Sequence, residues 1–222
     1  MEFPQHIFLS EKNKQRYLRI VSPIGRLLGR VGLHPNVMSV AGLVLSMLAG
    51  LIYSTGYLFW AAWVVVLAGT CDVLDGELAR QTGKTSRFGA FFDSSLDRFS
   101  ELFIFLGLAW HYSGGEAFLA GYPGRPENVQ SPWVVLFIIL AIAGSFMVSY
   151  TRARAEGLGV DCKEGWFQRP ERITLLVIGS LLGAIPAIGP LFMKAVLFLL
   201  AVLSNFTALQ RIAHVKKQLE AR

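Results

Sequence analysis

The sequence predicts an all-α membrane protein with six transmembrane helices, preceded by an amphipathic helix at the membrane surface. The chain has 222 residues, of which 53% are hydrophobic and only 16% are charged. A water-soluble domain of this length would need more polar residues to cover its surface. Apolar stretches long enough to cross a bilayer recur along the chain, and most charged residues lie between them. We therefore expect an integral membrane protein.

The N-terminal segment, residues 1–33, has the pattern of a helix that lies on a membrane. From Ser10 to Leu33, apolar residues recur at helical spacing among basic ones, which predicts an amphipathic helix on an anionic leaflet. We expect Pro23 to interrupt this helix. A solvated basic leader is the alternative interpretation. The segment lacks the apolar core of a secretory signal, so we expect it to be a juxtamembrane segment.

Residues 34–222 are expected to form one domain of six membrane-spanning helices. The six apolar stretches cover roughly residues 36–55, 57–79, 88–112, 131–152, 171–188 and 190–210. An even number of crossings places both termini on one side of the membrane. Of the 21 Lys and Arg residues, 18 lie on that side, so the positive-inside rule predicts that both termini face the cytosol. Residues 114–130 are then expected to form a non-cytosolic loop.

Four carboxylates lie in stretches that are otherwise apolar enough for lipid. Asp72 and Asp75 are three residues apart, and Asp93 and Asp97 are four apart, so each pair projects from one face of its helix. If the two faces meet, the carboxylates repel one another unless cations lie between them, and two divalent cations would balance four charges. Oxygen ligands favour Mg²⁺, with Mn²⁺ or Ca²⁺ behind it. The alternative is a set of mutually neutralised structural acids.

These acids belong to a longer motif, D-x2-D-G-x2-A-R-x8-G-x3-D-x3-D, which runs from Asp72 to Asp97. The motif resembles the signature of the CDP-alcohol phosphotransferase family at all of its specified positions. The resemblance implies a membrane enzyme that transfers a phosphatidyl-type group from a CDP-lipid and releases CMP. It also implies a homodimer and two Mg²⁺ or Mn²⁺ ions held by Asp72, Asp75, Asp93 and Asp97. Asp97 would in addition be the catalytic base for the acceptor hydroxyl.

A second motif, His34-Pro35-Asn36-Val37-Met38-Ser39, precedes the first apolar stretch. Pro35 suits the first turn of a helix whose N-terminal amides can face a phosphate, although an ordinary helix start would look the same. The motif resembles the family's Thr-Pro-Asn-x-x-Thr, with His34 and Ser39 in place of the threonines. The resemblance implies that the residues that bind the CDP-lipid donor are Pro35, Asn36, Val37, Met38, Gly76, Arg80, Ser86 and Gly89.

Arginine motifs follow the fourth apolar stretch, one at Ser149–Glu156 and one at Arg169-Pro170-Glu171-Arg172. Arginines at helix ends can offer bidentate hydrogen bonds to a phosphate, or can simply flank the membrane on its cytosolic side. The two motifs resemble the family branch that makes phosphatidylinositol phosphate or its archaeal ether-lipid counterpart. This resemblance implies an acceptor-phosphate site formed by Arg152, Arg169, Arg172 and Arg211.

The sequence therefore predicts a transferase whose partners are a CDP-lipid donor, a phosphorylated polyol acceptor and the lipid bilayer. Inositol 1-phosphate is the expected acceptor, and glycerol 3-phosphate is the alternative within the same chemistry. A divalent cation transporter that uses the acids as an ion site is the alternative class. No nucleic-acid partner is expected, because aromatic residues do not interleave with the basic patches. Cys71 and Cys162 are expected to be free thiols, and the active site is expected on the cytosolic side of the cell membrane.

Overall fold

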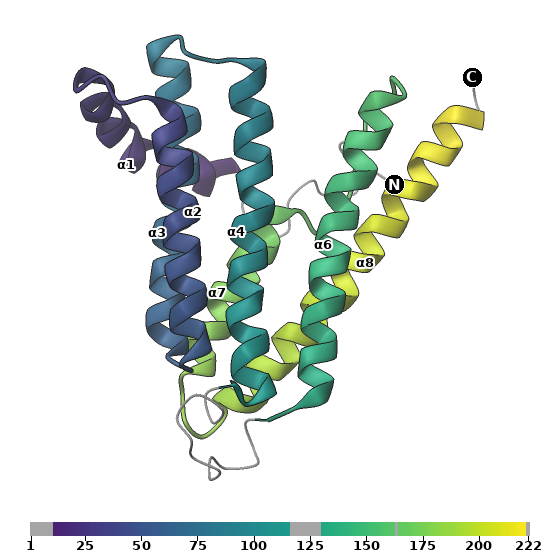
Figure 1. Ribbon diagram of the computed structural model, residues 1–222. Helices are drawn as coiled ribbons and strands as arrows, with labels where there is room; N and C mark the ends of the chain where they lie inside the picture. Colours follow the sequence, from purple (N-terminus) through teal and green to yellow (C-terminus); the bar gives the residue numbers. More distant parts are fainter. Residues whose placement is uncertain (1–10, 116–129, 163, 221–222) are drawn as a thin grey trace. The chain divides into compact units, whose positions relative to one another are not determined.

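The computed structural model describes residues 11–115, 130–162 and 164–220, and every regular element within these ranges is an α-helix. Most of the predicted non-cytosolic loop, residues 116–129, lies outside the described ranges. The contacts of the chain divide it into two units, which among the described residues comprise residues 11–115 and residues 130–220. Figure 1 labels the seven helices. They are α1 (Glu11–Arg30), α2 (Pro35–Ser54), α3 (Leu58–Thr82), α4 (Arg87–Ser113), α6 (Pro132–Gly157), α7 (Arg169–Gly183) and α8 (Gly189–Glu220).

The helices fall at the six predicted stretches, and four of them are long and apolar enough to cross a membrane. These four are α2, α3, α6 and α8. The other two differ for separate reasons: α7 has only 15 residues, and α4 carries Asp93, Asp97 and Glu101 along its length. The described residues therefore confirm an all-α fold, and its four candidate membrane spans are those of a multi-pass membrane protein.

In the first unit, α2 packs against both α3 and α4. Side-chain caps stabilise the starts of α2 and α4, where the donor motif and the acidic motif lie. His34 Nδ1 accepts a hydrogen bond from the Asn36 amide at 3.2 Å, and Ser86 Oγ accepts one from the Gly89 amide at 2.9 Å. These bonds satisfy amide groups that have no partner in the first helical turn. The start of α2, the end of α3 and the start of α4 consequently lie at one end of the group (Figure 1).

The contact between α2 and α4 depends on two glycines. A methyl group added to Gly107 would overlap the carbonyl group of Gly50, and a methyl group added to Gly50 would overlap the main chain at Phe103. Small residues allow helix backbones in a membrane to approach closely. This close approach packs the C-terminal halves of α2 and α4 together.

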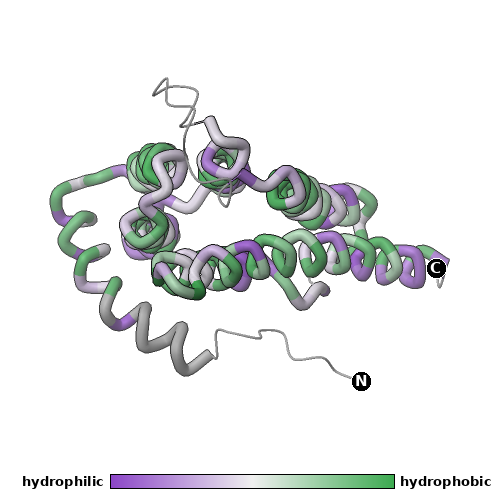
Figure 2. The backbone as a smooth tube through the Cα atoms, turned by 90° about the horizontal axis from the view of Figure 1, so that it is seen from below, coloured by the Kyte–Doolittle hydropathy of each residue, from purple (hydrophilic) through white to green (hydrophobic). Residues whose placement is uncertain are grey.

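Helix α1 packs against the C-terminal part of α3, near the acidic motif. Contacts with α3 lie on both sides of Pro23, because Ser22 Oγ accepts a hydrogen bond from Gln81 at 3.3 Å and Gly25 lies beside the Glu77 side chain. The prediction that Pro23 interrupts this helix was wrong: α1 is continuous from Glu11 to Arg30. A proline removes only one hydrogen bond of the helix, and these contacts hold the residues on both sides of it in place. Figure 2 shows hydrophilic and hydrophobic residues alternating along the coloured part of α1.

In the second unit, α8 packs against both α6 and α7. Gly144 of α6 allows Ser204 and Asn205 of α8 to approach its backbone closely. Asn205 Nδ2 donates a hydrogen bond to the Leu140 carbonyl of α6 at 2.8 Å, so a polar side chain also joins the two helices. These contacts fix the ends of α6 and α8 that carry the arginines.

Candidate active site

Three of the four predicted metal ligands come together in the first unit. Oxygen atoms of Asp72 and Asp75 on α3 and of Asp93 on α4 all lie within 4.8 Å of one another. Asp75 is buried and the other two are half-buried. The i,i+3 spacing places the first pair on one face of α3, and α2 holds the start of α4 beside that face. Three carboxylates this close repel one another, and a set of oxygen ligands with no nitrogen or sulfur suits a hard divalent cation.

The fourth predicted ligand, Asp97, is not part of this group of three. It is half-buried and lies one helical turn after Asp93, with Oδ2 at 3.9 Å from a guanidinium nitrogen of Arg98. The structure thus shows three acids whose oxygens converge and a fourth acid nearby on α4.

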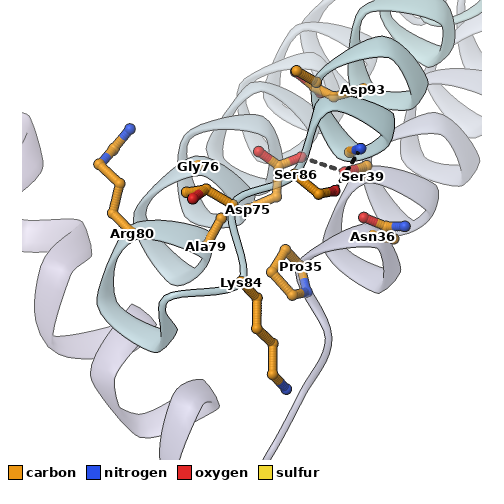
Figure 3. Close-up of a pocket in the computed structure, with 13 residues that line it drawn as sticks. Pro35, Asn36, Ser39, Asp75, Gly76, Ala79, Arg80, Lys84, Ser86 and Asp93 are labelled. Atoms are coloured by element: carbon orange, nitrogen blue, oxygen red, sulfur yellow. Dashed lines mark hydrogen bonds between the residues drawn. The ribbon is translucent and has the colours of Figure 1, made fainter.

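A pocket next to the acids contains most of the predicted donor-binding residues (Figure 3). The predicted residues that line it are Pro35, Asn36, Gly76, Arg80, Ser86 and Gly89, together with Asp75 and Asp93. Val37 and Met38 do not line the pocket, and half of the Val37 side chain is exposed. Five lining residues were absent from the predicted site: Ser39, Ala79, Lys84, Thr85 and Ala90.

The pocket combines negative and positive groups, and helix geometry places them. The N-termini of α2 and α4 both open onto it, so the positive ends of the two helix dipoles lie beside it. Arg80 and Lys84 add cationic side chains at the end of α3 and in the loop after it. Gly89 lets the Ser86 hydroxyl lie close, since an added Cβ would be 3.0 Å from Ser86 Oγ. A pyrophosphate with divalent cations matches this arrangement of charges.

Arg80 has a neighbour that the sequence motifs did not indicate. Its guanidinium donates to Glu77 Oε2 at 3.0 Å, and Gln81 donates to Glu77 Oε1 at 2.7 Å. Gln81 also reaches Ser22 on α1. The i,i+3 spacing of Glu77 and Arg80 is the signal from which this pair could have been predicted. The hydrogen bonds connect α1 to a predicted donor-binding residue.

The predicted acceptor residues lie in the second unit, where three of them are close enough to interact electrostatically: Arg152, Arg172 and Arg211. Arg172 and Arg211 are buried, each with 3% of its surface exposed. Arg211 donates to the main-chain carbonyls of Glu164 at 2.7 Å and Val148 at 2.5 Å.

The other two predicted acceptor residues lie at helix ends. Arg152, near the end of α6, has 46% of its side chain exposed and forms an ion pair with Glu156 at 2.9 Å. Arg169 is the first residue of α7. The second unit therefore contains both buried and accessible arginines.

Comparison with known proteins assigns the family. The sequence model of CDP-alcohol phosphatidyltransferase matches residues 32–207. Archaetidylinositol phosphate synthase of Methanothermobacter thermautotrophicus is 35% identical over 202 residues, which cover 91% of each chain. Phosphatidylinositol phosphate synthase of Mycolicibacterium smegmatis is 32% identical over 202 residues, which cover 90% of this chain and 85% of the relative.

Solved structures agree with these sequence matches. The crystal structure of Mycobacterium tuberculosis phosphatidylinositol phosphate synthase with CDP-DAG bound has a TM-score of 0.75 and 34% identity, and covers 89% of this chain and 94% of that one. A structure of the same enzyme with manganese and citrate has a TM-score of 0.74 and 33% identity, with 88% of each chain covered. The chain therefore belongs to the CDP-alcohol phosphatidyltransferase family.

Proposed function

We propose that this chain transfers a phosphatidyl-type group from a CDP-lipid to inositol 1-phosphate and releases CMP. The observation that carries the proposal is the group of Asp72, Asp75 and Asp93 beside a pocket lined by the donor-motif residues. The relatives described above are phosphatidylinositol and archaetidylinositol phosphate synthases, and one structure contains CDP-DAG. Family membership favours this enzyme over a divalent cation transporter.

The pocket is proposed to bind the pyrophosphate of the donor. The positive dipole ends of α2 and α4 favour its negative charge, and the Arg80 guanidinium can donate hydrogen bonds to its oxygens. Asp72, Asp75 and Asp93 would hold the divalent cations, with Asp97 as a fourth ligand. Two such ions, Mg²⁺ or Mn²⁺, stabilise the negative charge that develops toward the CMP leaving group when they are bound.

Asp97 is proposed as the catalytic base. It lies one turn from Asp93 on α4 and outside the group of three acids, so a carboxylate oxygen can accept a proton. The acceptor hydroxyl oxygen forms a bond to the lipid-side phosphorus as its proton passes to Asp97. The bond from that phosphorus to the bridging oxygen breaks, and CMP departs with the electron pair.

The acceptor phosphate is proposed to bind to Arg152, Arg169, Arg172 and Arg211. The exposure of Arg152 makes it the clearest candidate for direct contact, because its guanidinium can exchange Glu156 for a phosphate. Val37 and Met38 are also proposed to contact the donor, because they belong to the motif at the start of α2.

The proposed location is the cytoplasmic membrane, with six spans formed by α2, α3, α4, α6, α7 and α8 and with both termini and the site on the cytosolic side. The distribution of Lys and Arg supports this orientation. We propose that α1 lies at the membrane interface, since it exposes Ile24 and Leu27 next to Arg26 and Arg30. The working unit is proposed to be a homodimer.

A single assay tests the reaction and the acceptor together. Purified protein in detergent is given CDP-diacylglycerol and Mg²⁺, and CMP release is measured with inositol 1-phosphate, glycerol 3-phosphate, free inositol or serine. We expect release with inositol 1-phosphate and little with the other three. Faster release with glycerol 3-phosphate would reassign the acceptor, and no release with any of the four would reject the proposed reaction.

A further inference from the structure

A hydroxyl group from α2 contacts the most buried carboxylate of the acidic group. Ser39 Oγ donates a hydrogen bond to Asp75 Oδ2 at 2.6 Å (Figure 3). Both residues are buried, with 9% of Ser39 and 6% of Asp75 exposed. The bond joins two helices, and its partners are 36 residues apart in the sequence. Asp75 is one of the three acids whose oxygens converge.

The geometry of this bond favours a role in orientation. Hydrogen bonds from a hydroxyl to an ionised carboxylate are typically about 2.5–2.7 Å long and are stronger than neutral ones. A serine hydroxyl has one hydrogen to donate, and here it is directed at Asp75. Because one oxygen of the carboxylate is held by α2, the group cannot rotate freely about its Cβ–Cγ bond. The direction of both oxygens is therefore set by the position of α2.

Ser39 also connects this carboxylate to the donor pocket. It follows Pro35 by four residues and Asn36 by three, so the three side chains share one face at the start of α2. All three line the pocket. The helix whose N-terminus opens onto the pocket thus also orients an acid that would hold a cation.

We propose that Ser39 is a positioning residue for the divalent-cation site, acting through its hydrogen bond to Asp75. This inference depends on the proposed function, because it assumes that Asp72, Asp75 and Asp93 bind a divalent cation. It gives Ser39 a role other than direct contact with the donor. Removing the hydroxyl leaves Asp75 in place but lets its carboxylate rotate, and the cation should bind more weakly.

The test measures Mn²⁺ binding in the absence of both substrates. Electron paramagnetic resonance of free Mn²⁺ gives the dissociation constant for purified full-length protein in detergent. Partners that orient metal ligands typically contribute about 10- to 100-fold in affinity, and we expect a loss of this size for Ser39→Ala. Ser39→Thr keeps the hydroxyl and should restore binding. Ser39→Cys keeps the size of the side chain but is a weak donor, so it should behave like Ser39→Ala.

Ser46→Ala is the matched control. Ser46 is a buried serine on the same helix, and its hydroxyl donates to the Gly42 carbonyl of its own helix at 2.9 Å. Its Mn²⁺ affinity should equal that of the wild type. The melting temperature of each variant without metal shows whether it is folded, and Ser39→Cys provides the comparison if Ser39→Ala is not.

The outcomes separate this inference from the proposed function. Unchanged Mn²⁺ affinity in folded Ser39→Ala and Ser39→Cys, with a raised KM for the CDP-lipid, would make Ser39 a donor contact and overturn the inference alone. Wild-type protein that binds no Mn²⁺ would overturn the metal site itself, and the proposed function with it. Weaker binding in both variants, restored in Ser39→Thr, supports the positioning role.

Discussion

The acidic group on α3 and α4 and the arginines of α6, α7 and α8 each gather side chains of one charge, but they compensate for repulsion differently. The oxygens of Asp72, Asp75 and Asp93 converge within 4.8 Å. Arg211 instead directs its guanidinium at two main-chain carbonyls, those of Val148 and Glu164. Carboxylates only accept hydrogen bonds, so carbonyl groups cannot stabilise them, whereas arginine has five donors that carbonyls satisfy well.

This difference indicates a ligand-binding role for the converging acids and a structural role for the buried arginines. Because a converging group of acids is stabilised by a cation, its residues are expected to serve binding before they serve the fold. The buried arginines are already part of the fold through main-chain hydrogen bonds. An accessible arginine such as Arg152, whose partner is a single exposed carboxylate, can exchange that partner for a phosphate at less cost than the buried Arg172 or Arg211.

The largest effect is expected when the acidic group loses a charge. Asp75→Asn and Asp93→Asn should each lower turnover by about 10³-fold or more, since the electrostatic contribution of bound metal is several kcal/mol. CMP release over a range of Mg²⁺ concentrations measures the effect, and stabilisation of the protein by Mn²⁺ should disappear with it. Glu220→Gln, the same change in a surface ion pair on α8, is the control. Wild-type turnover in both aspartate variants would contradict the metal assignment.

Asp97→Asn is expected to have the next largest effect, and by a different route. Asp97 lies outside the group of three, so Mn²⁺ affinity should fall less than in Asp75→Asn, while the rate at saturating metal falls by about 10² to 10⁴, the usual contribution of a positioned base. Single-turnover CMP release during a metal titration separates the two effects. If high Mg²⁺ restored the rate, Asp97 would be a metal ligand and the base would be another group.

Replacing Arg152 or Arg211 tests, in the second unit, the distinction between an arginine that binds a ligand and one that supports the fold. Arg152→Ala should raise the KM for inositol 1-phosphate by about 10- to 100-fold, because a hydrogen bond to a charged group contributes about 1.5–3 kcal/mol. Its melting temperature should be unchanged. Arg154→Ala, an exposed arginine two residues later, is the matched control for charge.

Arg211→Ala should instead destabilise the fold. Arg211 links the Val148 and Glu164 carbonyls, and a hydrogen bond from a charged group typically contributes about 1.5–3 kcal/mol. Denaturant or thermal unfolding in detergent measures the loss. If Arg211→Ala were as stable as the wild type and changed only the KM, the structural role of the buried arginine would be rejected.

The smallest effect concerns Cys162, which lies beside the arginines and outside the membrane-spanning helices. Burial raises the pKa of its thiol, and Arg211 and Arg152 oppose part of this increase. In a Cys71→Ala background, Cys162 should therefore react more slowly with iodoacetamide in the folded protein than after denaturation, between about pH 8 and pH 9. Equal rates in the two states would show that the thiol is exposed.

The same pKa predicts how stability depends on pH. The folded state holds the thiol proton more tightly than the unfolded state. The contribution of Cys162 to the free energy of unfolding is therefore complete below the unfolded pKa of about 8.5. It is lost as the pH rises through the higher pKa of the folded state. Replacing Cys162 with serine should remove this part of the pH dependence.

Much of the candidate site could be predicted because its signals are local. Pro35 starts α2 as expected, since a proline suits the first turn and His34 caps it. The spacing of Asp72 and Asp75 places them on one face of α3 whatever surrounds that helix. Apolar stretches of membrane length predicted the positions of the helices, because a bilayer requires continuous apolar segments whose backbone bonds are satisfied internally.

What the sequence by itself determined was therefore the helices, the acidic motif and the family resemblance. Only the tertiary structure determined which groups meet: it separated Asp97 from the other acids, placed Ser39 against Asp75, and turned Arg211 toward carbonyls 47 and 63 residues away. It also kept α1 continuous through Pro23, with α3 supporting both sides. Helical periodicity sets the face on which a side chain lies, but its partner on another helix depends on close packing, here through glycines such as Gly50 and Gly107.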